Sequence, residues 1–149
     1  MSHRSIHLAS IGALLAFSFA TSPSFAAGPA LKPLTLSKEC SKYSGDNPSF
    51  CTVLESSLDA LPKGTKVLYY GPVTNNPNFS TNNVILDDGA GSTAAGNCIV
   101  NFTAGPSGMC AFYAGSGKLA GFQAMVKVTV DDKQVWHWEG GYLLAPSTN

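Results

Sequence analysis

The sequence predicts an all-β fold, an antiparallel β-barrel of about six to eight strands with one short N-terminal helix. The first observation is an alternation of side chains over 122–130 that resumes over 134–144, the period of strands with one buried face. The second is a series of short apolar segments separated by runs rich in glycine, asparagine and proline. Short strands at this spacing are typical of a small barrel or sandwich.

The segment 122–144 is predicted to be a long hairpin around which the other strands are arranged. A three-residue loop at 131–133 would place Val128 opposite Trp136 and Val126 opposite Trp138, so that the valines and tryptophans share one face. A two-residue loop would move every side chain of one strand to the other face, and burial of apolar area disfavours it. The opposite face of the hairpin is then predicted to carry Lys127, His137 and Glu139.

The first 26 residues have the features of a secretory signal peptide. Arg4 precedes the apolar run IGALLAFSFA, and small residues lead to a cleavage site after Ala26. The mature protein is therefore expected to be secreted or periplasmic, and no later segment is long and apolar enough for a membrane span. We divide the remaining 123 residues into an N-terminal extension over 27–64, with the short helix, and a barrel over 65–145. Together they are expected to form one domain.

The charge of the mature chain excludes several classes of partner. Eight lysines face nine acidic residues, so the net charge is about −1, and no arginine remains after residue 26. This composition does not favour nucleic acid or an anionic membrane as a partner. His137 is the sole histidine of the mature chain, so we expect no metal site.

The four cysteines are expected to form two disulfides, since an exported protein matures in an oxidising compartment. Of three possible pairings, the chain favours Cys40 with Cys51 and Cys98 with Cys110. The second pair flanks the turn-like TAGPSG, and a hairpin centred near Ala104 would place these two cysteines directly opposite each other. A redox-active thiol pair is the alternative, but the chain has no C-x-x-C motif.

The elements are expected in the following order. After an extended lead-in with a short strand at 34–36, the segment 46–61 has apolar residues at helical spacing before Pro62, with Asp46 or Asn47 as its cap. Strands then follow at 65–73, 84–88, 97–102, 109–114, 118–130 and 134–144.

Two segments resemble the allene oxide cyclase and dirigent β-barrel superfamily. They are CAFYAGSGKLAGF, which starts at Cys110, and VILDDGAGSTAAGNCIV, which starts at Val84; the closing VWHWEGGY is also similar to the end of small exported bacterial members. The resemblance covers roughly residues 65–144 and implies a barrel of about eight strands with an apolar lumen. It also implies cofactor-free cyclisation of a fatty-acid epoxide or guidance of phenolic coupling, and association as a homo-oligomer.

The aromatic residues of the strands are the candidate ligand-binding residues, because an aromatic lumen suits an apolar or aromatic ligand. They are Trp136, Trp138, Tyr142, Phe122 and Tyr70. The alternative is that these rings fill the core of a small barrel.

The candidate catalytic residues are Asp87, Asp88 and Tyr69. The two carboxylates end a strand beside a glycine-rich loop, where burial at the barrel mouth would raise the pKa toward use as an acid or base; the alternative is a solvated turn. We weigh His137 with Glu139 and Lys127 as a second cluster, for which a solvent-exposed trio is the simpler interpretation.

These observations lead to two functional hypotheses. The first is a cofactor-free barrel that binds a small hydrophobic or phenolic compound and acts as an isomerase or cyclase. The second is a non-catalytic carrier of ligands, or a protein-interaction module, of the cell envelope.

Overall fold

The computed structural model describes residues 29–46, 48–71 and 78–144, and these form a β-barrel. Eight strands follow one another along the chain: β1 (Lys32–Glu39), β2 (Ser49–Ser56), β3 (Lys66–Tyr70), β4 (Phe79–Asp87), β5 (Thr93–Asn101), β6 (Ser107–Gly115), β7 (Gln123–Val130) and β8 (Trp136–Leu143). A single turn of 3₁₀ helix, η1 (Gly117–Leu119), connects β6 to β7.

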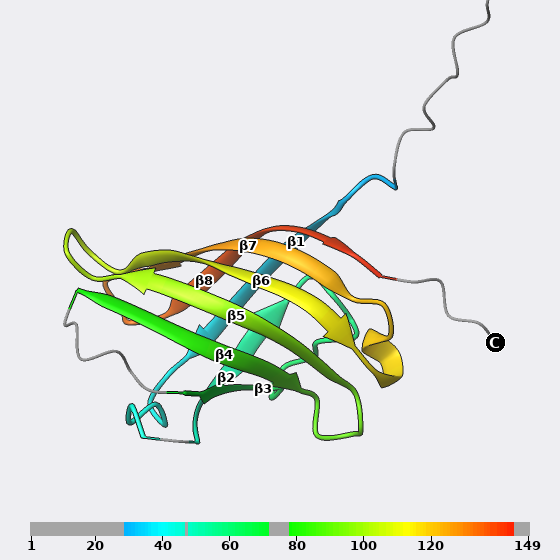
Figure 1. Ribbon diagram of the computed structural model, residues 1–149, viewed down its shortest axis with the longest axis horizontal. Helices are drawn as coiled ribbons and strands as arrows, with labels where there is room; N and C mark the ends of the chain where they lie inside the picture. The colour runs from blue at the N-terminus through cyan, green and yellow to red at the C-terminus, as the bar shows by residue number, and fades with distance from the viewer. Residues whose placement is uncertain (1–28, 47, 72–77, 145–149) are drawn as a thin grey trace, which may run out of the picture.

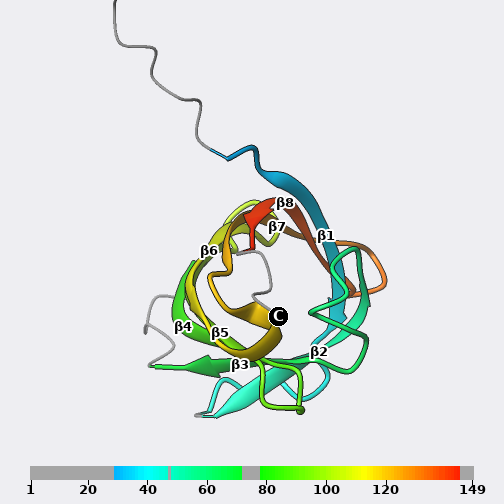
Figure 2. The same cartoon turned by 90° about the vertical axis from the view of Figure 1, so that its right-hand side faces the viewer.

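Each strand pairs antiparallel with the next one in the chain, and β8 pairs with β1 to close the barrel. Figure 2 looks along the barrel from the end that carries η1 and shows the strands as a ring. Figure 1 shows the barrel from the side, with η1 and the β4–β5 connection at its right-hand end. The predicted fold class is therefore confirmed, with eight strands.

The two ends of the lumen have different side chains. Toward η1, the inward positions of the strands are apolar, as at Leu36 and Leu86, and Leu61 from the β2–β3 connection and Leu119 from η1 are fully buried. Toward the opposite end, the inward positions include Lys38, Ser80 and Asn82, which are buried although they are polar. One end of the barrel is therefore a mainly apolar core, and the buried polar side chains of the strands lie toward the other end.

A glycine allows one of the core rings to enter the lumen. Gly96 in β5 lies beside Phe112 of β6, and a Cβ atom at this position would overlap the carbonyl oxygen of Ala111 and the Phe112 ring. The Phe112 ring then packs 5.4 Å from Trp138 and 6.0 Å from Phe122, measured between ring centroids.

The helix expected at 46–61 is absent, and the prediction was wrong. Within this segment, residues 49–56 form β2, which pairs with both β1 and β3. The first two strands of the barrel therefore come from residues 32–56, which were expected in the N-terminal extension. Ser49, Cys51 and Val53 are buried and alternate with less buried residues. The helical spacing arose because Leu58 and Leu61 belong to the following connection, where they pack into the barrel end. Asn47, considered as a cap, lies outside the described residues.

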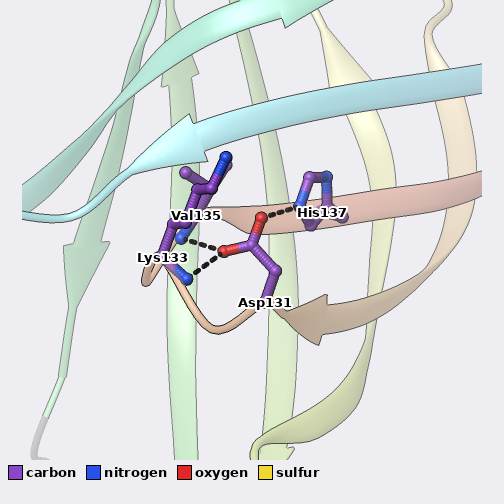
Figure 3. Close-up of polar contacts among 4 residues, drawn as sticks. All are labelled: Asp131, Lys133, Val135 and His137. Carbon is purple, nitrogen blue, oxygen red and sulfur yellow. Dashed lines mark hydrogen bonds and ion pairs between the residues drawn. The ribbon is translucent and has the colours of Figure 1, made fainter.

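The β7–β8 hairpin has the predicted faces but a different register. Val128 lies opposite Trp138, and Val130 opposite Trp136, so the connection contains five residues, 131–135, rather than three. A shift of two residues preserves which side chains face inward. The longer loop is stabilised by Asp131, whose Oδ1 accepts hydrogen bonds from the backbone N–H groups of Lys133 and Val135, each at 2.9 Å (Figure 3).

Both predicted disulfides are confirmed. Cys40 is bonded to Cys51 and links the end of β1 to β2, while Cys98 and Cys110 are bonded directly across β5 and β6. These two bonds indicate an oxidising, extracytoplasmic setting. The predicted signal peptide, 1–26, lies outside the described residues.

In the part of the chain that the structure describes, no helix has the length and apolar character needed to cross a lipid bilayer.

Candidate functional site

A cavity of about 190 Å³ lies at the end of the barrel opposite η1. It is formed where β1, β3 and β5 end and where β4, β6 and β8 begin, because all of these strand ends meet at one rim in an antiparallel barrel. Its aromatic lining comes from Tyr43, Tyr69, Phe102, Trp136 and Trp138. The four cysteines also line it, so both disulfides form part of its wall.

Lys38 is the buried cation of this cavity. It follows Leu34 and Leu36 at alternate positions of β1 and therefore points into the lumen, where its exposed fraction is 2%. Its Nζ lies 5.1 Å from the ring centroid of Trp136, 5.3 Å from that of Trp138 and 5.5 Å from that of Tyr69. An ammonium group close to aromatic rings is stabilised by their negative faces.

The polar contacts of Lys38 Nζ are few. It donates a hydrogen bond of 2.9 Å to Tyr69 Oη and lies 3.4 Å from Cys40 Sγ. Among the described residues, no carboxylate oxygen lies within 4.0 Å of Nζ. The cation is therefore buried among rings and a phenol, without an anionic partner from this part of the chain.

Burial changes the protonation of both members of this pair. Desolvation lowers the pKa of Lys38 from its ordinary value of 10.5 to about 7, since burial disfavours the charged amine. Burial, and to a smaller extent the neighbouring Tyr43, raises the pKa of Tyr69. Near neutral pH the lysine is therefore divided between its two forms, while the tyrosine keeps its proton.

Other polar groups of the cavity come from β4 and β8. Asn82 Nδ2 donates a short hydrogen bond to Ser80 Oγ, and both side chains are buried. Trp138 is 1% exposed, and its indole Nε1–H has no acceptor among the described residues. Buried donors of this kind normally have a partner.

The structure brings three of the predicted site residues together at the cavity. Tyr69, Trp136 and Trp138 all line it. Tyr70 is not among the lining residues, because its side chain has the opposite parity to Tyr69 on β3. Phe122 and Tyr142 pack against each other at 6.2 Å in the filled half of the lumen, where they contribute to the core.

Asp87 and Asp88 lie at the far end of the barrel from the cavity, beside the β4–β5 connection. Asp87 Oδ1 accepts a hydrogen bond from the N–H of Gly89. Asp88 Oδ1 accepts hydrogen bonds from the N–H groups of Ser92 and Ala90, and these hold the pKa of Asp88 below its ordinary value. The direction is opposite to that expected for a carboxyl group buried at the barrel mouth.

The second predicted cluster lies on the outer face of the hairpin, as expected. Lys127 is directly opposite Glu139 on β7 and β8, but His137 binds Asp131 instead, with 3.1 Å between Nε2 and Oδ2 (Figure 3). This contact, together with the N–H groups of Val135 and Lys133, lowers the pKa of Asp131. The histidine therefore helps to hold the β7–β8 loop.

Lys38, the most unusual group of the cavity, was not among the residues predicted from the sequence. The segment LTLSK contains the signal, since Leu34, Leu36 and Lys38 have the same parity and a strand there buries all three. In β4, Ser80 and Asn82 have the same parity as the buried residues Val84 and Leu86 and are buried with them. In each case the alternation extends past the apolar residues onto polar ones.

No family model, no curated protein and no solved structure matches the chain. The resemblance to the allene oxide cyclase and dirigent superfamily thus stays a prediction beyond the level of the eight-stranded antiparallel barrel. Among the described residues, no group of three or more His, Cys, Asp or Glu side chains is placed to hold a metal ion.

Proposed function

We propose that the cavity at the end of this barrel opposite η1 binds a small hydrophobic or phenolic compound, without a metal or an organic cofactor. The observation that carries this proposal is the Lys38 amine, buried in an aromatic cavity with no carboxylate within 4.0 Å among the described residues. A buried amine without a counter-ion destabilises a fold. Buried titratable groups in such cavities are concentrated at functional sites.

The cavity volume favours a ligand with a single ring. A cavity of about 150 Å³ lined by apolar side chains holds benzene, and the cavity here is about 190 Å³. A phenol of this size could place its ring among Trp136, Trp138 and Tyr69 and its oxygen at Lys38 Nζ. A long-chain lipid would exceed this volume, so the phenolic class is the better match.

The Lys38–Tyr69 pair is also where we propose that a proton would move if the barrel acts as an isomerase or cyclase. Of the three catalytic candidates, Tyr69 lines the cavity, whereas Asp87 and Asp88 lie at the other end of the barrel. The two heteroatoms of the pair are 2.9 Å apart, within the range for proton transfer. The alternative is a barrel that carries its ligand without changing it. Once the ligand is known, a test for its chemical conversion by the protein distinguishes the enzyme from the carrier.

The test uses the intrinsic fluorescence of the protein. The chain contains two tryptophans, Trp136 and Trp138, and both line the cavity. Titration with para-cresol should therefore change the tryptophan emission with a saturable curve. Native mass spectrometry of protein purified gently from its own host should in addition show a small molecule that is lost on denaturation.

Two variants make the test specific. Lys38→Met should weaken para-cresol binding roughly tenfold to a hundredfold, because a hydrogen bond to a charged group contributes about 1.5–3 kcal/mol. Lys66→Met is the matched control, since Lys66 also lies near a ring, 5.2 Å from that of Phe50, but is exposed. The proposal fails if the wild-type protein binds neither para-cresol nor any co-purified compound, which would favour the protein-interaction module.

A further inference from the structure

We propose that Lys38 is a nucleophile that captures a small aromatic aldehyde as an imine, so that the ligands of the cavity include carbonyl compounds held covalently. This inference rests on the proposed function, because it uses the same cavity. It adds a bond-forming step that simple binding of a phenol does not require.

Burial sets the Lys38 amine apart from the other lysines of the described residues. Lys38 is the one buried lysine among the eight in the described residues, and the other seven are exposed. An amine attacks a carbonyl group only in its neutral form, and removal from water in an apolar pocket favours that form. The lowered pKa of Lys38, about 7, agrees with this surrounding.

The groups around Nζ leave the amine able to lose its proton. In the described part of the chain, the other titratable side chains that line the cavity are Tyr43 and Tyr69, since the cysteines are in disulfides. Neither side chain is a carboxylate, and burial raises the pKa of Tyr69, so its phenol keeps its proton near neutral pH. No neighbouring anion in this region therefore holds the amine in its charged form.

A proton donor lies next to the Lys38 amine. Tyr69 Oη lies 2.9 Å from Lys38 Nζ, close enough to exchange protons with groups on the attacked carbon. Attack forms the C–N bond, and one amine proton passes to the carbonyl oxygen to give a carbinolamine. Tyr69 then donates its proton to the hydroxyl group, water leaves, and the C=N bond forms. The resulting phenolate takes the remaining N–H proton, so the net change is release of one water without oxidation or reduction.

The cavity also matches a small aromatic aldehyde in size. An aromatic aldehyde with one ring fits the volume of about 190 Å³, and the walls of Trp136 and Trp138 offer faces for its ring. The aldehyde carbon would then reach Lys38 Nζ, which lies within 5.3 Å of both indole centroids.

The test is reductive trapping with benzaldehyde. The folded full-length mature protein is incubated near pH 7 with limiting benzaldehyde and cyanoborohydride, and the product is measured by intact mass and peptide mapping. We expect one benzyl group on Lys38, formed at least about tenfold faster than on any exposed lysine, because only about four in ten thousand molecules of an ordinary lysine are neutral at this pH. Labelling spread evenly over the exposed lysines, or an unlabelled Lys38, would overturn the proposal.

Variants and conditions locate the reactivity in the folded site. Lys38→Arg should remove the fast adduct, whereas Lys66→Met should keep it; Tyr69→Phe should keep the adduct but slow its formation severalfold. Circular dichroism establishes that each variant is folded, and mapping of the wild-type protein does not depend on the variants. In concentrated urea the preference for Lys38 should disappear, and its persistence would show that the reactivity does not come from the cavity.

A parallel titration separates failure of this inference from failure of the proposed function. Benzyl alcohol has the size of benzaldehyde but no carbonyl group. Saturable binding of benzyl alcohol or para-cresol without trapping at Lys38 would overturn the imine alone. Absence of both binding and trapping would overturn both proposals.

Discussion

At the scale of single residues, the most unusual side chain of the described barrel is Lys38, a buried amine with no carboxylate oxygen within 4.0 Å among the described residues. Its backbone position in β1 alternates with Leu34 and Leu36, and this alternation alone places the amine inside the barrel. The surrounding rings and the phenol of Tyr69 stabilise the amine only in part. Burial therefore lowers its pKa to about 7, and stability must depend on pH.

Replacement of Lys38 by Met should change this pH dependence. Between pH 7 and about pH 9.5, the unfolded chain holds the Lys38 proton while the folded chain has released it, since the pKa falls from 10.5 to about 7 on folding. Stability of the wild-type protein should thus rise with pH by up to about 1.4 kcal/mol per pH unit relative to Lys38→Met. The measurement is urea unfolding of both proteins at several pH values.

The sign of this pH dependence distinguishes an amine that is destabilised by burial from one that is stabilised by a charged partner. The cost of the buried charge is present in full below pH 7 and is relieved as the pH rises, so the slope is positive. Lys66→Met, which removes an exposed lysine, should have the same slope as the wild type. Parallel curves for wild type and Lys38→Met would show that the amine has not lost its proton in the folded barrel.

At the scale of elements, the β7–β8 hairpin shows how a loop sets a register. Five residues connect the strands, and Asp131 accepts hydrogen bonds from two backbone N–H groups within the loop. Gln134 completes the turn with φ of 62°, the left-handed conformation that side chains other than glycine rarely adopt. The five-residue loop therefore contains one strained backbone position.

Gln134→Gly should stabilise the protein. The left-handed conformation costs roughly 1–2 kcal/mol for a residue with a Cβ atom, and the greater freedom of glycine in the unfolded chain offsets about 0.5–1 kcal/mol of this. A net gain of about 0.5–1 kcal/mol is expected in urea unfolding.

The same substitution in a strand provides the control. Gln123 is also exposed but lies in β7, where Gln123→Gly should destabilise the protein by about 0.5–1 kcal/mol. If Gln134→Gly destabilises the protein as much as Gln123→Gly does, the backbone at Gln134 is not strained.

At the scale of the whole molecule, the barrel combines a filled half with a hollow half. The connection from β2 to β3 and the turn η1 contribute leucines that close one end. The other end is held by the two disulfides, which also line the cavity. Covalent bonds there compensate for the apolar contacts that a hollow region lacks.

Each disulfide should contribute similarly to stability. The sequence separations are 11 and 12 residues, so the loss of chain entropy on closure is nearly equal, and each bond should contribute about 2–4 kcal/mol. We expect this loss in urea unfolding for the double variant Cys98→Ala with Cys110→Ala, and for the double variant Cys40→Ala with Cys51→Ala.

Unfolding in the presence of a reductant is the matching control. Reduction should lower the stability of each double variant only by the contribution of its one remaining disulfide. A variant in which all four cysteines are replaced by alanine should have the same stability with and without reductant. An unchanged unfolding curve of the wild type after both bonds are cleaved would contradict the stabilising role.

The part of the structure that depends on local pattern was predictable from the sequence. The period of two over 122–144, the turn between Cys98 and Cys110, and the spacing of short apolar segments led to the barrel, the pairing of these cysteines and the inward position of Trp138. These features depend on residues that are close in the sequence or on a single turn. Burial of apolar area is favourable for only one of the two faces that a strand could turn inward.

What the tertiary structure decided depends on neighbours far apart in the sequence. Residues 49–56 form a strand because β1 and β3 offer hydrogen bonds on both sides, which outweighs a helical spacing of leucines. The Lys38 amine meets Tyr69 and Trp136 only because closure joins β1 to β8 and encloses β3 in the same ring. Closure also separates Asp87 and Asp88 from the cavity, since it sends the two ends of each strand to opposite rims. The sequence determined which side chains point inward, and the closed barrel determined which of them share a cavity.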